Sequence, residues 1–325
     1  MSELATVQSE DVRWYADTFE RIQHNVEAAV LGKRQVIRLG LTCLVSEGHL
    51  LLEDLPGTGK TMLARALAKS LDCSFARIQF TPDLLPSDIT GVTVYDQAHG
   101  QFSFHPGPLF HSLVLADEIN RASPKTQSAL LEVMEEGHVT VDGKTHEVRR
   151  PFMVIATQNP IEQAGTYQLP EAQLDRFLMR TSVGHPDAES TEALLAESRI
   201  RDRAADLVPV VTVREIERMG RLADMVHVDP AVISYVRRLA EASREVPGVR
   251  IGLSTRGCLA WIRSAKAWAL AERRGHVVPE DIATLAHPVL GHRLLMGSGA
   301  AYGGTTSDEV IDDLLAQVPV PRDRA

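Results

Sequence analysis

The chain has 325 residues, of which 44% are hydrophobic and 24% charged, a composition typical of globular domains. This length predicts two domains, and the net charge of −9 argues against a general nucleic-acid binder, which needs a basic surface. The sequence shows no secretion signal and no apolar run of about 18 residues, which excludes a membrane span and favours a cytoplasmic protein.

The first part of the chain predicts two helices followed by a strand, a loop and a helix. Apolar residues recur at three- and four-residue spacing over residues 11–30, which indicates an amphipathic helix, and a second helix is expected over residues 33–47. The apolar run "HLLLE" predicts a buried strand, and "TMLARALAKSL" is rich in strong helix formers. The loop between them therefore lies where a phosphate-binding loop is usually found.

That loop reads "DLPGTGKT", residues 54–61, and differs from the pattern G-x-x-x-x-G-K-[ST] by having Asp54 at the first glycine. Glycines allow the backbone to approach phosphate closely, the lysine supplies a cation, and the Thr61 hydroxyl can complete a magnesium shell. We expect the nucleotide contacts from Asp54, Pro56, Gly57, Thr58, Gly59, Lys60, Thr61 and Met62.

Asp54 does not abolish this site. Aspartate tolerates backbone angles that most residues avoid, and its carboxylate can accept hydrogen bonds from nearby N–H groups. We therefore expect its side chain to be turned away from the phosphates.

Up to about residue 185, apolar strands alternate with helices, which predicts a parallel sheet covered by helices on both faces. The predicted strands are "SFARIQF", "LVLAD", "FMVIATQ" and "FLMRTSV". Two hairpins interrupt this α/β pattern, one over residues 92–104 and one over residues 138–149 with an Asp142-Gly143 turn. The hairpins are either plain surface excursions or functional loops.

Polar residues follow two of these strands. Asp117 ends "LVLAD" and can reach magnesium directly or through water, and Glu118 is placed to polarise an attacking water. Asn159 follows the strand in "VIATQNP" and could hold that water or the γ-phosphate. The alternative for Asn159 is a simple Asn-Pro turn.

Three arginines are candidates for contact with phosphate. Arg176 and Arg180 in "LPEAQLDRFLMR" lie one turn apart if the helix persists, and one of them is a candidate arginine finger. The alternative is a surface arginine paired with a nearby acid. Arg256 follows the helix cap in "GLSTRGCLAW", where the helix dipole disfavours a cation unless an anion such as a γ-phosphate faces it.

After residue 187 the periodicity is only helical, with helices expected near 188–204, 213–226, 229–245, 255–273 and 279–290. We therefore expect an α/β domain over residues 1–186 and a helical lid domain over residues 187–325. A glycine-rich linker, residues 297–304, precedes a last helix whose Thr306 and Glu309 have capping-box spacing.

From about residue 20 to residue 320 these features resemble the AAA+ ATPases, and within them the MoxR group. "LLEDLPGTGKT" resembles Walker A, "LVLADEINRA" Walker B, "IATQNP" sensor 1, "LPEAQLDRF" the arginine-finger segment and "STRGCLAWIRSAKAWAL" the sensor 2 helix. "VLGKRQV" resembles the adenine-side segment, with Lys33 where glutamine is common. The hairpins resemble the helix-2 insert and the pre-sensor-1 hairpin, which face the pore of AAA+ rings.

This resemblance implies Mg²⁺-dependent hydrolysis of ATP by a homo-oligomer, commonly a hexameric ring, in which Arg176 reaches the neighbour's nucleotide. It further implies a chaperone that acts on a client protein together with a separate von Willebrand A domain protein. Three other functions stay open: a DNA-translocating motor, a magnesium-chelatase motor subunit and a non-hydrolysing nucleotide switch. The acidic balance disfavours the motor, and the intact set of Glu118, Asn159 and Arg176 disfavours the switch.

Overall fold

A computed structural model describes residues 7–55, 57–160, 166–196, 202–297 and 304–321. Its helices are α1 (Ser9–Glu27), α2 (Arg34–Val45), α3 (Lys60–Ser70), α4 (Pro86–Thr90), α5 (Pro124–Glu136), α6 (Glu171–Leu174), α7 (Ala188–Ala196), α8 (Val213–Asp224), α9 (Pro230–Glu245), α10 (Thr255–Ala271), α11 (Pro279–Leu290) and α13 (Ser307–Gln317). Its strands are β1 (Leu50–Glu53), β2 (Phe75–Gln79), β3 (Gly91–Asp96), β4 (Gln101–Pro106), β5 (Leu113–Asp117), β6 (His138–Val141), β7 (Lys144–Glu147), β8 (Met153–Gln158), β9 (Met179–Thr181), β10 (Val249–Ile251) and β11 (Leu295–Met296).

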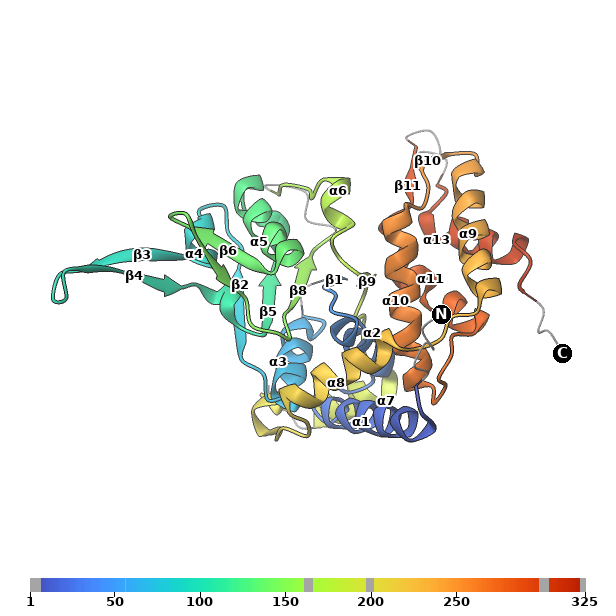
Figure 1. The fold of residues 1–325 in the computed structure, drawn as a ribbon, viewed down its shortest axis with the longest axis horizontal. Coiled ribbons are helices and arrows are strands. Elements are labelled where there is room, and N and C mark those ends of the chain that lie inside the picture. Colours follow the sequence, from blue (N-terminus) through green and yellow to red (C-terminus); the bar gives the residue numbers. More distant parts are fainter. Residues whose placement is uncertain (1–6, 56, 161–165, 197–201, 298–303, 322–325) are drawn as a thin grey trace, which may run out of the picture.

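The centre of the molecule is a five-stranded sheet in the order β2-β5-β8-β1-β9, and every neighbouring pair in it is parallel. Parallel strands bring their carboxyl ends to one edge of the sheet, where the loop before α3 and the residues after β5 and β8 meet (Figure 1). We call this the carboxyl edge. The opposite one, where the strands begin, is the amino edge.

Both faces of the sheet are buried, and the side chains along each strand alternate between two cores. Leu50 and Leu52 of β1 pack with helices α1, α2 and α3, whereas Leu51 packs on the other side with α4 and α5. Each of these leucines is fully buried. This two-sided burial explains why the strands read as continuous apolar runs, and it confirms the predicted α/β fold.

The lid domain contains α9, α10, α11 and α13, which stand beside the sheet domain in Figure 1. The expectation that residues 188–293 are purely helical is wrong at β10, which pairs with β11 in a short antiparallel ribbon. These strands are too short for periodicity to reveal. The last helix begins with the predicted capping box of Thr306 and Glu309.

Packing crosses the predicted boundary near residue 186. Helix α8 lies after this boundary, yet Ile216 and Met219 on it share one core with α1 and α2. We therefore regard α8 as part of the interface between the two predicted domains. None of the helices within the described residues has the length and apolar character needed to cross a bilayer.

The two predicted hairpins are present, and the first extends far from the body of the molecule (Figure 1). Strands β3 and β4 expose apolar side chains toward the hairpin tip, including Tyr95 and Phe102, of which Phe102 is 73% exposed. The second hairpin turns at Asp142 and Gly143, both with positive φ angles as a type I′ turn requires. The hairpins touch through Phe104 and His146, whose rings stack with centroids 3.9 Å apart.

His49 connects three elements at the amino edge. Its Nε2–H donates to the carbonyl of Met134 at the end of α5 (3.0 Å), and its Nδ1 accepts from the N–H of Val154 in β8 (3.0 Å). This pattern requires the neutral imidazole. Burial lowers the pKa of His49 to about 4, against a smaller opposing effect of its bond to Met134.

Acid should therefore destabilise the protein through His49. Because the pKa of His49 in the unfolded chain is about 6.5, the unfolded state takes up the proton first as the pH falls. The contribution of neutral His49 to the free energy of unfolding is therefore complete above pH ~6.5 and is lost as the pH falls toward ~4. The full loss is about 3 kcal/mol. We expect His49→Gln to flatten the fall in the free energy of unfolding between neutral pH and about pH 4.5, measured with urea. His24→Gln, at an exposed position, is the control and should keep the wild-type slope; equal slopes for both variants would contradict this role of His49.

Candidate nucleotide site

The phosphate loop connects β1 to α3 at the carboxyl edge. Gly57 and Gly59 have φ angles of 85° and 92°, in the left-handed region that side chains rarely adopt. A Cβ at either position would meet nothing within 4 Å, so the backbone angle and not crowding favours glycine there. Pro56 lies outside the described residues, and Thr58 donates its hydroxyl to the carbonyl of Leu55 (3.3 Å).

Lys60 lies inside this loop. Its ammonium donates to the carbonyls of Asp54 (3.0 Å) and Leu55 (2.9 Å), which hold the cation over the space that the loop encloses. Thr61 and Met62 follow in the first turn of α3, and Met62 also packs against the core. The helix N-terminus and the lysine together make this a site for an anion.

Asp54 is buried and turned away from the loop interior, and its carboxylate accepts from the N–H groups of Val183 and Gly184. Its own φ angle is not positive, so the expected tolerance of unusual backbone angles is not what keeps aspartate here. The carboxylate instead fastens the loop to the segment after β9. Lys33 contacts the same segment, since its ammonium donates to the carbonyl of His185.

Asp117 ends β5 and is held by two neighbours. One carboxylate oxygen accepts from the hydroxyl of Thr157 in β8 (2.6 Å), and the other accepts from the guanidinium of Arg77 in β2 (Nη2, 2.7 Å). Thr157 is buried, and Asp117 is 8% exposed. The strands on either side thus fix the orientation of this carboxylate.

Glu118 has a left-handed backbone, with φ 57° and ψ 50°, a strain of about 1–3 kcal/mol for a residue other than glycine. Thr157 supports this conformation because its hydroxyl oxygen accepts the N–H of Glu118 (2.8 Å). The Glu118 carboxylate accepts from Gln79 (3.0 Å) and Arg121 (3.1 Å). A strained residue that is held so closely is typical of a functional position.

Asn159 follows β8 directly, so it comes to the same edge as the phosphate loop, Asp117 and Glu118. The structure thus brings together the predicted residues Lys60, Thr61, Asp117, Glu118 and Asn159 at one edge of the sheet. The oxygens of Thr61 and Asp117 fit magnesium, which is usually held by one or two protein oxygens together with phosphate and water. Among the residues that the structure describes, no group of three or more acidic, histidine or cysteine side chains is arranged so that it could hold a metal ion.

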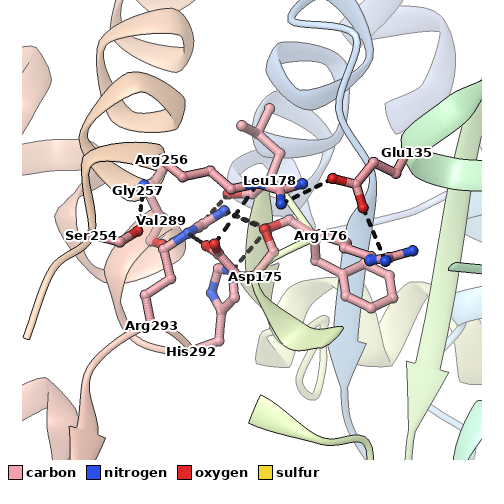
Figure 2. Close-up of polar contacts among 11 residues, drawn as sticks. Glu135, Asp175, Arg176, Leu178, Ser254, Arg256, Gly257, Val289, His292 and Arg293 are labelled. Carbon is pink, nitrogen blue, oxygen red and sulfur yellow. Dashed lines mark hydrogen bonds and ion pairs between the residues drawn. The ribbon is translucent and has the colours of Figure 1, made fainter. Parts of the chain in front are cut away.

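Two of the three predicted arginines lie elsewhere. Arg176 precedes β9, so it lies at the amino edge, and its guanidinium pairs with Glu135 at the end of α5 (3.0 Å). Arg256, in the first turn of α10, pairs with the other oxygen of Glu135 (3.1 Å) and lies 3.8 Å from Asp175. Figure 2 shows Glu135 between the two guanidiniums.

The expectation that Arg256 faces a γ-phosphate stays a prediction, and the anions beside it in this structure are Glu135 and Asp175. The packing of the lid against the amino edge brings Arg256 to Arg176, away from the phosphate loop. Arg180 does not continue a helix, since α6 ends at Leu174, and it lies on β9 with its side chain bonded to Glu53 (3.3 Å).

A buried arginine fastens the lid to the segment that carries Arg176. Arg293 is 8% exposed, pairs with Asp175 (2.6 Å) and donates to the carbonyls of Phe177 (2.7 Å) and Leu178 (3.0 Å) (Figure 2). His292 donates to the same Phe177 carbonyl (2.9 Å). Burial lowers the pKa of Arg293, against the opposing effect of Asp175. A cation is stable in such a place only when it is paired and hydrogen-bonded, as it is here.

Sequence reasoning missed the supporting residues of both edges. Polar side chains in strands that are otherwise apolar are the signal that could have revealed Thr157 in "VIATQNP" and Arg77 and Gln79 in "SFARIQF". Glu135 and Arg293 give no such signal, because their partners are distant in the chain.

Comparison with known proteins agrees with this fold. Residues 49–179 match the family described as "ATPase family associated with various cellular activities (AAA)", and residues 241–314 match the AAA lid domain. A crystal structure of an ATPase candidate from Cytophaga hutchinsonii superimposes with a TM-score of 0.89 at 36% identity, covering 96% of this chain and 98% of that one.

Two curated relatives cover nearly the whole chain. The uncharacterized protein YeaC of Bacillus subtilis is 44% identical over 94% of this chain and 95% of its own length. Chaperone MoxR1 of Mycobacterium tuberculosis is 38% identical over 94% of this chain and 83% of its own length. Because the AAA domain and the AAA lid domain are both matched, and Chaperone MoxR1 is 38% identical over 94% of this chain, the chain belongs to the MoxR family of AAA+ ATPases.

Proposed function

We propose that this protein hydrolyses ATP with magnesium. The loop amides and Lys60 bind the phosphates, and Thr61 and Asp117 hold the magnesium, which when bound neutralises charge on the phosphates. Glu118 accepts a proton from the attacking water, and Asn159 holds that water or the γ-phosphate. Thr157 keeps Asp117 and Glu118 in their orientations.

The observation that carries this proposal is the division of the site between two edges of the sheet. The phosphate loop, Asp117 and Glu118 lie at the carboxyl edge, whereas Arg176 and Arg256 lie at the amino edge. An arginine at the amino edge cannot contact phosphates bound in its own chain's loop without a large rearrangement. It can contact phosphates bound by a second copy that docks head to tail. A cavity of about 1210 Å³ beside Arg176 and Arg256 leaves room for such an approach.

Head-to-tail docking produces a closed ring when the rotation between subunits closes, and we propose a ring, most simply a hexamer. We propose that this ring acts as a chaperone, and the similarity to Chaperone MoxR1 supports this function. The exposed apolar residues of β3 and β4 provide a surface for a client protein, and a separate von Willebrand A domain protein is the expected partner. We expect this activity in the cytoplasm, where ATP is available.

Steady-state ATP turnover, followed over a range of protein concentrations together with mass by light scattering, tests this function. We expect turnover per subunit to rise on assembly by a factor of about 10³ or more, since an arginine finger supplied in trans is worth that much. Chelation of magnesium should abolish it, and single- or double-stranded DNA should leave it unchanged. Full turnover by a monomer would contradict the division of the site, and strong stimulation by DNA would favour a translocating motor.

A further inference from the structure

Glu135 is the residue that joins the two arginines at the amino edge. Its two carboxylate oxygens bind different partners, Arg176 from the sheet domain (Oε2, 3.0 Å) and Arg256 from the lid domain (Oε1, 3.1 Å). Figure 2 shows the carboxylate between the two guanidiniums, which come from segments that lie 80 residues apart in the sequence. One side chain thus fixes the relative position of two cations from two domains.

The position of Glu135 is unfavourable unless it has such partners. It lies in the last turn of α5, where the helix dipole disfavours an anion, and Arg256 lies in the first turn of α10, where the dipole disfavours a cation. Each group offsets the cost of the other. Arg176 also donates to the carbonyl of Leu131, one turn earlier on α5, so that its guanidinium lies along the end of that helix.

The charges of this cluster do not cancel. Three guanidiniums, those of Arg176, Arg256 and Arg293, face two carboxylates, those of Glu135 and Asp175. These five side chains together carry one net positive charge. Glu135 therefore lowers the repulsion between Arg176 and Arg256 without removing the attraction of the pair for an anion.

Stability alone does not account for this arrangement. The side chain of Glu135 is 35% exposed, and those of Arg176 and Arg256 are 28% and 51% exposed. Ion pairs this exposed contribute about 0–1 kcal/mol, whereas misplacing a catalytic group by about 1 Å can cost about 10²-fold in rate. The larger effect lies in catalysis.

We propose that Glu135 is a positioning residue that holds Arg176 and Arg256 side by side as one phosphate-binding unit for the neighbouring subunit. This inference rests on the proposed function, in which both arginines act in trans. In this proposal Glu135 itself contacts neither the nucleotide nor the attacking water.

Glu135→Gln tests the proposal, because glutamine keeps the shape but loses the charge and one of the two acceptors. We expect kcat per assembled subunit to fall about 10- to 100-fold, while ADP affinity of the subunit's own site and the unfolding temperature stay near wild type. Glu136→Gln is the matched control, since Glu136 is the next residue on α5 and is exposed. It should keep wild-type kcat.

A double-mutant cycle separates this role from general damage. In an Arg176→Ala, Arg256→Ala background, Glu135→Gln should lower kcat by less than about twofold further, because nothing is left for it to position. An equal loss with and without the arginines would overturn the proposal, as would a Glu135→Gln protein with the kcat of the Glu136→Gln control. If the arginine variants themselves kept wild-type kcat, the proposed trans arrangement would fail instead.

Discussion

Replacing Glu118 by glutamine is expected to slow ATP turnover about 10²- to 10⁴-fold while ATP binding is kept. Glutamine fills the same space and can still bond to Gln79, but its neutral amide cannot accept the proton of the attacking water. The phosphate loop, which is held by Lys60 and by the Asp54 contacts to Val183 and Gly184, does not depend on this side chain. Binding and hydrolysis should therefore separate.

The measurement is steady-state phosphate release together with ATP affinity from calorimetry on the same protein. Glu132→Gln, an exposed acid on α5, provides the matched control with an identical change in charge. A Glu118→Gln protein that hydrolyses ATP at the control rate would show that another group is the base. Loss of both binding and hydrolysis would point to damage at the strained backbone of residue 118.

The fold and the carboxyl edge could be predicted because their signals are local. The strand–loop–helix order around Gly57 and Gly59, and the carboxylates at the end of "LVLAD", lie within a few residues of one another. In a parallel sheet every strand contributes its carboxyl end to the same edge, so the order of the motifs along the chain is enough to bring them together.

The features that the sequence did not predict depend on contacts between distant parts of the chain. The acceptor role of Asp54 was predicted, but its partners Val183 and Gly184 are about 130 residues away. The left-handed conformation of Glu118 depends on Thr157 in another strand. No local pattern contains either fact.

The position of Arg256 is the clearest example. Its place at a helix N-terminus was evident from the sequence, and so was its need for an anion. Which anion it meets is decided by how the lid packs on the sheet domain, and Arg293, with its bonds to Phe177 and Leu178, fixes that packing. In this structure the anion is Glu135, which the sequence does not single out.

The proposed division of the site makes each subunit incomplete on its own. In the ring that we propose, a subunit has its nucleotide edge and its arginine edge on opposite sides of one sheet, so that its interfaces are heterologous and repeat around the ring. Arg180 belongs to the first of these edges, because it lies on β9 and bonds to Glu53 beside the phosphate loop. Arg176 belongs to the second, which makes it the better candidate for the finger.

Arg176→Ala should accordingly lower turnover about 10³-fold or more without preventing assembly. Mixing it with Glu118→Gln should restore activity, because a subunit with an intact Glu118 can then receive Arg176 from its neighbour. In random assemblies of equal amounts, one interface in four has this arrangement, so about a quarter of wild-type turnover is expected. The measurement is phosphate release after the two inactive proteins are mixed, with mixed assembly verified by pull-down of differently tagged subunits.

Arg180→Ala, mixed with Glu118→Gln in the same way, is the matched comparison. Because Arg180 contacts Glu53 of its own chain, its loss affects the subunit's own site, and a neighbour should not be able to compensate. Rescue of Arg180→Ala but not of Arg176→Ala would make Arg180 the finger. Rescue of neither variant, in assemblies shown to be mixed, would mean that the arginine acts within its own chain. The lid and the Arg176 segment would then have to leave the amino edge, where Arg293 and Glu135 hold them in this structure.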